Sequence, residues 1–354
     1  MNSDHNINGN ESKHQRRIRY SGTHPKTYKE KYKEQQPEKY ADTVAKVIQK
    51  GSTPAGMHLP ICVKEILEIL QITPGQSGLD ATLGYGGHTL EMLKCLDSKG
   101  HLYAIDVDPI ELPRTRERLA RLGYGPEILD VRQMNFSDID QISSEVGPFQ
   151  FILADLGVSS MQIDNSDRGF SFKYEGPLDL RLNPEKGEPA SSRLRNMSFD
   201  ELQGMLIENA DEPHSAEIAR AIVTKLKKGA KISTTTELRD IITEALKKIP
   251  KISEEDIKKS CQRCFQALRI DVNDEFEVLD SFLEKLPDAL AKGGRVAILT
   301  FHSGEDRRVK KSFKYFLNQG IYSEIAPDPI RPSAEECYSN GRARCAKLRW
   351  AVKA

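Results

Sequence analysis

Short apolar runs alternate with segments of helical spacing over residues 56–165. The apolar runs are typical of strands buried on both faces, and they read SGLDAT, GHLYAIDVDP, EILDVRQMNF and FQFILADLGVSS. Before and between them the apolar side chains recur at the period of a helix, in LPICVKEILEIL, HTLEMLKCL and RTRERLARLG. Alternation of buried strands with helices predicts an α/β domain with a parallel sheet covered on both faces.

This alternation stops after Ser160. A loop-like stretch rich in Gly, Pro and aromatic residues comes first, and three helical patterns follow: SFDELQGMLIENA, SAEIARAIVTKLKKG and TTTELRDIITEALKKI. Ser198 and Glu201 have the spacing of a capping box. Strand signal returns at GGRVAILTFHS, behind a long predicted helix at FQALRIDVNDEFEVLDSFLEKLPDALA, and again at the C-terminal AKLRWAVKA. We therefore predict a helical domain over 166–260, inserted between two parts of the α/β domain at 56–165 and 261–354.

The first 55 residues carry a different pattern, with few apolar positions and many charges. From Glu11 to Lys50 there are eleven Lys or Arg and five Asp or Glu, a net charge of +6, with tyrosines interleaved. We predict a basic, flexible extension. An arm that contacts RNA and a merely solvated tail explain this composition equally well.

Overall composition narrows the class of protein. The 354 residues are 38% hydrophobic and 29% charged with zero formal net charge, so a globular core is expected. No apolar run reaches the roughly 20 residues that span a bilayer, and no secretory pattern is visible, which predicts a cytoplasmic protein without membrane contact. The six cysteines include one C-x-x-C at Cys261 and Cys264, without a second pair at zinc spacing, so we predict no metal.

Three glycines follow the first predicted strand, at Gly84, Gly86 and Gly87, and His88 comes next. Such a turn lets a ligand approach backbone N–H groups at the start of a helix. A triphosphate is excluded because the loop has no lysine, and the G-x-G-G spacing does not match the dinucleotide pattern. S-adenosylmethionine remains, and Asp80 at the end of the strand is expected to meet its α-ammonium group.

Acidic residues end two further predicted strands. Asp106 is expected to accept hydrogen bonds from ribose hydroxyls, whereas Asp108 before Pro109 suits a helix cap. Asp155 ends the fourth strand, at the edge of the sheet where ligands bind in such folds. We predict that His88 hydrogen-bonds the cofactor, at a helix start that disfavours the charged imidazolium.

Five segments occur in order from about His58 to the C-terminus: DATLGYGGHT, DLGVSSMQIDNSDRGFSFKYEGPLDLRL, FQALRIDVNDE, FHSGEDRRVKK and RARCAKLRWA. Together they resemble the MraW/RsmH family of 16S ribosomal RNA cytosine-N4 methyltransferases. The resemblance implies a class I, Rossmann-like, S-adenosylmethionine-dependent fold and a target in the decoding centre of the small ribosomal subunit, with a homodimer as one possible state. It also implies cofactor contacts at Gly86, Gly87, His88, Asp106, Phe136, Asp155 and Gln162.

The chemistry that this resemblance implies is attack of a cytosine N4 on the sulfonium methyl group. Asp155 is the first candidate for the proton acceptor, with His302 second. Phe170 and Phe172 are expected to stack on the flipped base. The phosphate-binding candidates are Arg168, Arg307, Arg308, Lys310, Lys311, Arg342 and Arg344, although a solvated helix face explains the run at 307–311 equally well.

Three departures from the family pattern lie in the part of the chain that is expected to bind the substrate. Gly304 stands where the family has Leu, DEPH at 211–214 replaces Gly-Glu-Glu-Arg, and KSCQRC replaces a His-Pro-Ala-Thr-Arg segment, keeping only Arg263. A paralogue with a shifted RNA target therefore stays open. So do a methyltransferase acting on DNA or protein, an RNA-binding protein with a relic site, and a nicotinamide oxidoreductase.

Overall fold

The computed structural model describes residues 60–354, so the predicted N-terminal extension lies outside the described residues. One seven-stranded sheet has the order β3-β2-β1-β4-β5-β7-β6, and β1 to β5 pair in parallel, whereas β7 is antiparallel to both neighbours. The strands are β1 (Ser77–Asp80), β2 (His101–Asp106), β3 (Leu129–Gln133), β4 (Phe149–Asp155), β5 (Leu290–Thr300), β6 (Tyr322–Ile325) and β7 (Lys347–Lys353). The predicted α/β sheet is confirmed.

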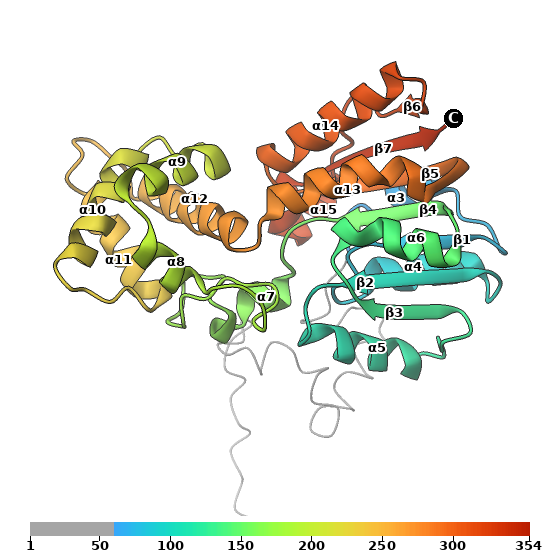
Figure 1. Cartoon of the computed structure of the whole chain (residues 1–354), viewed down its shortest axis with the longest axis horizontal. Helices are drawn as coiled ribbons and strands as arrows, with labels where there is room; N and C mark the ends of the chain where they lie inside the picture. The colour runs from blue at the N-terminus through green and yellow to red at the C-terminus, as the bar shows by residue number, and fades with distance from the viewer. Residues whose placement is uncertain (1–59) are drawn as a thin grey trace, which may run out of the picture. The chain divides into compact units, whose positions relative to one another are not determined.

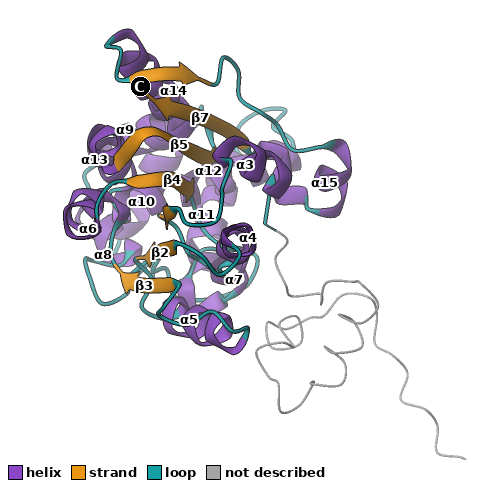
Figure 2. Cartoon of the chain, turned by 90° about the vertical axis from the view of Figure 1, so that its right-hand side faces the viewer, coloured by secondary structure: helices purple, strands orange, loops and turns teal. Residues whose placement is uncertain are grey.

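Helices cover both faces of the sheet, as Figures 1 and 2 show. On β4, Phe151 and Leu153 face one apolar core while Ile152 and Ala154 face the other. A strand buried on both faces explains why this segment is apolar almost throughout. One core is completed by α3 (Val63–Leu70), α4 (Gly87–Leu96) and α5 (Glu111–Arg121), and the other by α6 (Ile139–Val146), α13 (Glu275–Ala289) and α14 (Ser303–Asn318).

The strand order reverses at β1, because the chain proceeds from β1 to β2 and β3 on one side and to β4 on the other. The carboxyl ends of β1, β2 and β4 therefore lie side by side, and each of these strands ends on an aspartate: Asp80, Asp106 and Asp155. Open α/β sheets bind their ligands outside this switch point. The topology thus places the predicted acids at one edge.

The inserted helices pack around an apolar core of their own, and we call these helices the helical module (Figure 1). We call the seven-stranded sheet with the helices that cover its two faces the sheet half. Capping boxes fix the starts of three helices of the module: Ser198 with Glu201, as predicted, Thr234 with Glu237, and Ser253 with Asp256. The module follows α7 (Ser160–Asp164) and a long loop, and it comprises α8 (Ala190–Asn196), α9 (Phe199–Ala210), α10 (Ser215–Lys227), α11 (Thr235–Leu246) and α12 (Glu254–Val272). No helix within residues 60–354 combines the length and apolar character needed to cross a bilayer.

The long helix predicted from residue 265 onward is wrong, because α12 and α13 are separate helices that meet at a corner. Asp274 has a left-handed backbone with φ 48°, and the Asn273 side chain donates to the carbonyls of Leu180 and Arg269. The helical core also extends past the predicted boundary at residue 260, since Cys261 to Leu268 of α12 pack within it. One continuous apolar period across 265–289 conceals this corner in the sequence.

Candidate active site

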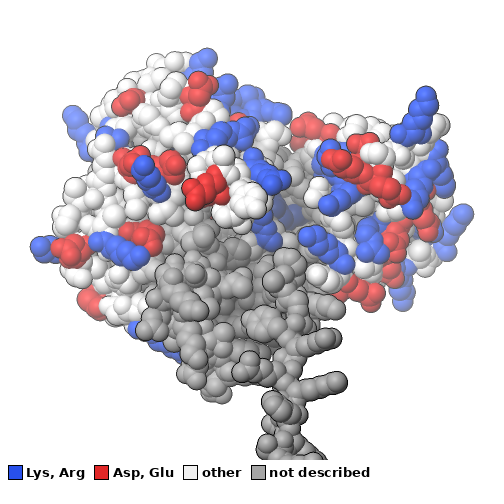
Figure 3. Space-filling model, turned by 180° about the vertical axis from the view of Figure 1, so that it is seen from behind, with Lys and Arg blue, Asp and Glu red and all other residues white. Residues whose placement is uncertain are grey.

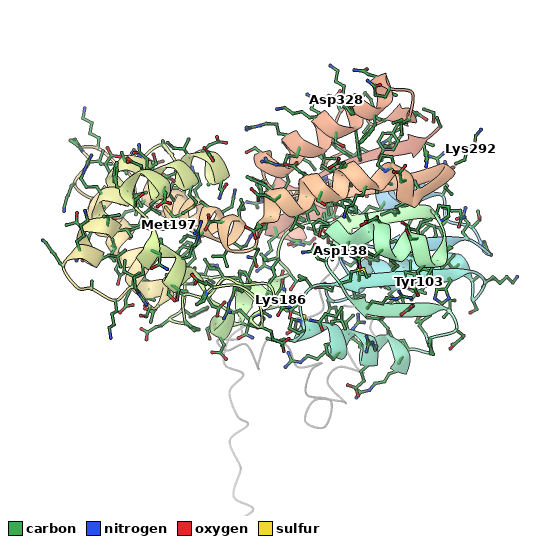
Figure 4. All side chains as sticks on the ribbon, viewed as in Figure 1. Tyr103, Asp138, Lys186, Met197, Lys292 and Asp328 are labelled. Carbon is green, nitrogen blue, oxygen red and sulfur yellow. The ribbon has the colours of Figure 1, made fainter. Side chains whose placement is uncertain are left out.

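A cavity of about 620 Å³ lies at the carboxyl edge of β1, β2 and β4. One wall comes from the loops after these strands, and the other from the loop at 182–187 and the corner between α12 and α13. Figure 3 shows the hollow between the sheet half and the helical module, with Lys and Arg side chains on its rims, and Figure 4 places Lys186 where the two halves join. This volume is typical of a site for a small molecule or cofactor.

The glycine loop after β1 is bonded to the end of β2. The amide of Gly84 donates to Oδ2 of Asp106 over 2.7 Å, and the amide of Asp108 donates to Oδ1 over 2.9 Å. Burial raises the pKa of Asp106 to about 6, although these two hydrogen bonds oppose the shift. Asp106 lines the cavity, so its position agrees with the predicted ribose contact.

Position 86 requires glycine for two reasons, the left-handed backbone of the turn and the close packing of helix α5 against it. Gly86 is the N-cap of α4 with φ 73°, and a Cβ atom there would lie 3.0 Å from the Thr115 side chain and 3.2 Å from Leu119. The Thr115 hydroxyl also donates to the carbonyl of Gly84 over 2.7 Å. Helix α5 therefore holds the loop in shape without a ligand. Gly87, the first residue of α4, also lines the cavity.

Asp80 is buried behind the cavity, and its carboxylate oxygens are engaged within the protein, so nothing in this arrangement supports its predicted contact with the cofactor ammonium, which stays a prediction. Its side chain is 1% exposed and is not among the residues that line the cavity. Oδ2 accepts from the Thr89 hydroxyl over 2.6 Å and Oδ1 from the amide of Thr82 over 3.1 Å. Burial raises the pKa of Asp80 to about 6. This carboxyl group braces the loop from behind.

His88 lines the cavity and directs both ring nitrogens at the protein, and its predicted hydrogen bond to the cofactor stays a prediction. Nε2 lies 2.9 Å from the carbonyl oxygen of Ile61, and Nδ1 lies 3.5 Å from Oδ2 of Asp155. The ring is 8% exposed, and burial lowers the pKa of His88. Only the flat side of the imidazole remains for a ligand in the cavity that it lines.

Asp155 is one of two carboxyl groups of the cavity, within residues 60–354, that have a buried oxygen without a hydrogen-bond partner; the other is Glu111, whose Oε1 is paired with Arg114. Its backbone amide donates to the Thr82 hydroxyl over 2.6 Å, and this bond holds the end of β4 against β1. Oδ1 is buried and has no hydrogen-bond partner within residues 60–354. Burial and the negative charge of Glu305 raise the pKa of Asp155 to about 7. Such a group can accept a proton near neutral pH.

His302, the second predicted catalytic residue, caps α14. Nδ1 accepts from the amide of Glu305 over 3.4 Å, and Nε2 lies 3.1 Å from Oε1 of the same residue. Burial opposes the charge on Glu305, but the hydrogen bond and charge of His302 hold the pKa of Glu305 below its usual value. His302 lines the cavity, and its Nδ1 serves the helix cap, whereas Nε2 faces the Glu305 carboxylate.

Glu275 lies beside this pair and completes a cluster whose ligand atoms are within 4.8 Å of one another. A metal ion could bridge such a set of His and Glu side chains. Arg269, however, already binds both carboxylate oxygens of Glu275, at 2.7 and 2.8 Å. The guanidinium supplies the positive charge that an ion would bring, and the cluster is stable as an ion-pair network.

Phe136 and Gln162 both line the cavity, as predicted for cofactor contacts. The Phe136 ring also packs edge-on against Phe282 with centroids 5.1 Å apart, so one side of it belongs to the core. Gln162 donates from Nε2 to Asp108 over 2.7 Å and accepts at Oε1 from Ser159 over 2.8 Å. Its amide orients neighbouring loops before it contacts any ligand. Oδ1 of Asp108 caps α5, as the sequence suggests.

Arg168, Phe170 and Phe172 are engaged in contacts within the protein, and their predicted contacts with RNA stay predictions. Nη1 of Arg168 donates to buried Asp108 over 2.8 Å, and the Arg168 side chain is 6% exposed. Phe170 lies in the core of the helical module, and Phe172 packs against Phe265 with ring centroids 5.3 Å apart. The loop that carries these side chains is long and is stabilised by burying them. Arg168 thereby ties the loop to Asp108 beside the sheet, and the two phenylalanines tie it to the helical module.

The two predicted phosphate contacts on α14 differ from each other. Arg307 is 58% exposed and lies 3.7 Å from Asp211 of the helical module, an arrangement that leaves it open to solvent. Arg308 donates to Asp280 over 3.1 Å, and its guanidinium lies 3.7 Å from the centre of the Phe276 ring. Arg307 therefore keeps its predicted role as a candidate, whereas Arg308 is engaged in packing α14 on α13.

Sequence reasoning missed the polar residues that line the cavity from the α12–α13 corner: Gln266, Arg269, Asn273, Asp274 and Glu275. A signal was present, because FQALRIDVNDE places Gln266, Arg269 and Asn273 at spacings of three and four. These three positions lie on one face of α12 and its C-cap, and all three line the cavity.

A parallel sheet with a strand-order switch at β1, a glycine loop after β1, acids ending β2 and β4, and an antiparallel β7 beside β5 define a class I methyltransferase domain. Residues 55–354 match the model of the MraW methylase family, and the chain belongs to that family. The predicted family and methyl-transfer class are thereby confirmed, and S-adenosylmethionine is the cofactor of these methylases.

Named relatives and one solved structure can be set beside the chain. The chain is 73% identical to "Ribosomal RNA small subunit methyltransferase H 2" of Alkaliphilus metalliredigens, over 98% of this chain and 100% of the relative. It is 67% identical to "Ribosomal RNA small subunit methyltransferase H 1" of Lachnoclostridium phytofermentans, over 99% and 100%. A putative rRNA methylase from Clostridium thermocellum aligns with TM-score 0.41 and 11% identity, over 84% of this chain and 100% of that structure.

Proposed function

We propose that this chain transfers a methyl group from S-adenosylmethionine to the exocyclic N4 of a cytosine in small-subunit ribosomal RNA, within the decoding centre. The observation that carries the proposal is Asp155, which lines the cavity between the glycine loop and the helical module and whose buried Oδ1 has no hydrogen-bond partner within residues 60–354. The names of the relatives support the RNA substrate. The cytosine and its N4 atom follow from the family resemblance.

The residues present fit the cofactor. Gly84 to Gly87 form a tight turn at the start of α4, Asp106 is fixed beside it, and Phe136 offers a ring face to the same cavity. When bound, S-adenosylmethionine supplies an electrophilic methyl group on a sulfonium. Asp106 suits the ribose hydroxyls, and Phe136 suits the adenine.

The chain's own contribution to the chemistry is positioning and proton transfer. The N4 lone pair of cytosine is delocalised into the ring, so attack on a methyl carbon needs an acceptor for the amine hydrogens. Asp155 Oδ1 can accept a hydrogen bond from the amine and then its proton, as the N–C bond forms and the sulfur keeps the electron pair. Holding both partners in line contributes several kcal/mol more.

The target base must leave its stack to reach Asp155. The cavity continues from the glycine loop to Arg269 and Asn273 on the α12–α13 corner, which is room beyond that of the cofactor loop. We assign this second part to the flipped base and its ribose. Lys186 at the junction of the halves and Arg307 on α14 are suited to the flanking phosphates.

Methylation of defined substrates tests the proposal. Purified protein and labelled S-adenosylmethionine are incubated with naked small-subunit ribosomal RNA, with small subunits from cells lacking the protein, with duplex DNA and with ribosomal proteins. Nuclease digestion and mass spectrometry then locate the label. We expect N4-methylcytidine at one position of the RNA. Label in DNA or protein, or at a carbon or ring nitrogen of the RNA base, would contradict the proposal.

A further inference from the structure

His88 and Asp155 form a buried pair whose geometry the family's cofactor contacts do not explain. Nδ1 of His88 lies 3.5 Å from Oδ2 of Asp155, and Nε2 is bound to the carbonyl oxygen of Ile61. The imidazole is thus held between a backbone carbonyl on one side and the carboxyl group that we assign as proton acceptor on the other.

The Ile61 carbonyl decides which nitrogen carries the hydrogen. A carbonyl oxygen can only accept, so Nε2 of His88 must donate. Burial lowers the pKa of His88, which favours the neutral ring. A neutral ring with hydrogen on Nε2 presents a lone pair from Nδ1 towards Oδ2 of Asp155.

A lone pair facing a carboxylate makes no hydrogen bond, whereas a lone pair facing a carboxylic acid does. The separation of 3.5 Å fits the first state, and a small closure after protonation would give the second. The pair is therefore asymmetric: neutral His88 stabilises Asp155 in its protonated form.

We propose that His88 is a positioning residue of the methyl transfer, which accepts a hydrogen bond from protonated Asp155 and so makes Asp155 a stronger base. This inference rests on the proposed function. As the N4–C bond forms and the C–S bond breaks, one amine hydrogen passes as a proton to Oδ1 of Asp155. The neutral carboxyl group then turns about its Cβ–Cγ bond and donates to Nδ1 of His88.

The charges around the pair act on its two members differently. Within residues 60–354 the main ionisable neighbours of the pair are acids or a thiol: Asp80 at the end of β1, Glu91 in α4, Glu336 in α15 (Ala334–Ser339), Glu305 in α14 and Cys62 before α3. Burial of Cys62 raises its pKa to about 12, so the thiol is neutral. Glu305 and Asp80 repel negative charge on Asp155, in the same sense as His88. Asp80, Glu336 and Glu91 also raise the pKa of His88, but burial is the largest influence on that ring and lowers its pKa.

The direct test is a titration of Asp155 in the full chain, without RNA. The protein is labelled with ¹³C at the aspartate carboxyl carbons, and the Asp155 signal is assigned by its loss in Asp155→Asn. His88→Phe keeps a ring of similar size and removes the acceptor. We expect the pKa of Asp155 to fall by about one, the equivalent of one lost hydrogen bond. His88→Gln, whose amide oxygen can accept, should restore most of the value.

Two further measurements separate this role from others. Single-turnover methyl transfer in His88→Phe should slow about tenfold, with its acid limb moved to lower pH by the same amount. The dissociation constant for S-adenosylmethionine should change less than threefold. The matched control is His101→Phe, because His101 is a half-buried histidine at the start of β2, away from the carboxyl edge of the sheet. This variant should leave the pKa of Asp155 unchanged.

An unchanged or higher pKa for Asp155 in His88→Phe would overturn the inference, and a weakened affinity for S-adenosylmethionine alone would make His88 a cofactor contact. If His88→Phe does not fold, as judged by circular dichroism, His88→Asn is read by the same criterion, because its amide is too short to span both partners. A wild-type protein inactive on RNA that still shows the pKa change would refute the proposed function and leave the pair intact.

Discussion

The sheet half and the helical module use their polar and aromatic residues in opposite ways. In the sheet half, Asp106 and Asp155 reach the cavity because strand order brings the ends of their strands together. In the segment that leads into the module, Arg168 and Phe170 are buried as structural contacts. Strand order places residues at the edge of the site, although Asp80 at that same edge is buried behind the cavity. Residues in a long loop cannot be placed in this way, because the loop needs a core of its own.

The departures from the family pattern lie within this comparison. Two of them touch each other in the module: Glu212 from the DEPH segment accepts from Arg263 over 2.7 Å and from Ser260 over 3.0 Å. The third, Gly304, lies against Phe276, where a Cβ atom would come within 2.6 Å of the ring. The replaced residues are therefore compensated by packing inside the protein, and they give no direct reason for a changed RNA target.

The largest expected effect belongs to the sheet half. Asp155→Asn removes the proton acceptor and keeps the shape of the side chain, so methyl transfer should fall by about 10²- to 10⁴-fold. Single-turnover transfer to ribosomal RNA measures this, and isothermal titration should show little change in affinity for S-adenosylmethionine. Asp288→Asn, at the exposed end of α13, is the control and should keep full activity. Activity within threefold of wild type in Asp155→Asn would remove Asp155 from the mechanism.

The next effect belongs to the module and concerns stability. Glu212 is fully buried, and Glu212→Ala leaves Arg263 without its partner, which should cost about 3 kcal/mol in the free energy of unfolding. The low end of the usual range applies because Arg263 is 29% exposed and can reach water. Urea denaturation of the full chain measures the loss. Exposed Glu208→Ala on α9 should cost less than about 0.5 kcal/mol. Equal losses in the two variants would mean that this ion pair does not hold the module.

Gly304→Leu tests whether the third departure is coupled to its neighbour on α13. The new side chain meets Phe276, and overpacking should destabilise the protein by about 1–3 kcal/mol. Phe276→Leu should also destabilise, but the double variant should recover more than half of the summed loss, because the smaller residue on α13 frees the space that the leucine introduced on α14 needs. Thermal unfolding of the four proteins gives the coupling. Strict additivity would show that Gly304 and Phe276 are independent.

The sequence predicts the sheet, the glycine loop and the strand-end acids because period and turn chemistry are local properties. It does not predict the corner between α12 and α13, since the apolar period runs through it and only the Asn273 side-chain bonds reveal the break. It also does not reveal the hydrogen-bond partners of Asp80 and His88. Asp80 precedes the glycine loop and His88 follows it. The direction of each side chain depends on its hydrogen-bond partner, Thr89 for Asp80 and Ile61 for His88, and the sequence pattern does not identify these partners.

The buried Asp155 carboxylate should also lower the free energy of unfolding at high pH, by less than the catalytic effect of Asp155 when both are expressed as free energies. Because burial raises its pKa from an ordinary value of 3.8 to about 7, the folded protein holds this proton more tightly than the unfolded chain. The resulting stabilisation is complete below pH 4 and is lost as the pH rises to about 7. Asp155→Asn should therefore be more stable than wild type at pH 8, by on the order of 1 kcal/mol because the side chain is 30% exposed, and not below pH 4. Urea denaturation at both pH values measures the difference, and an equal difference at both would contradict it.

The smallest effect concerns the rim between the two halves. Arg307→Gln removes an exposed cation that faces the helical module, so affinity for ribosomal RNA should fall only a few-fold. The slope of log affinity against log salt should decrease by about one, as for one lost phosphate contact. Arg308→Gln is the matched variant on the same helix. Its guanidinium is held by Asp280 and Phe276, so its loss should lower stability and leave the salt slope unchanged. If Arg308→Gln changes the slope and Arg307→Gln does not, the RNA path runs over the α13 side of α14, away from the module, and the helical module loses its place as the substrate-facing half.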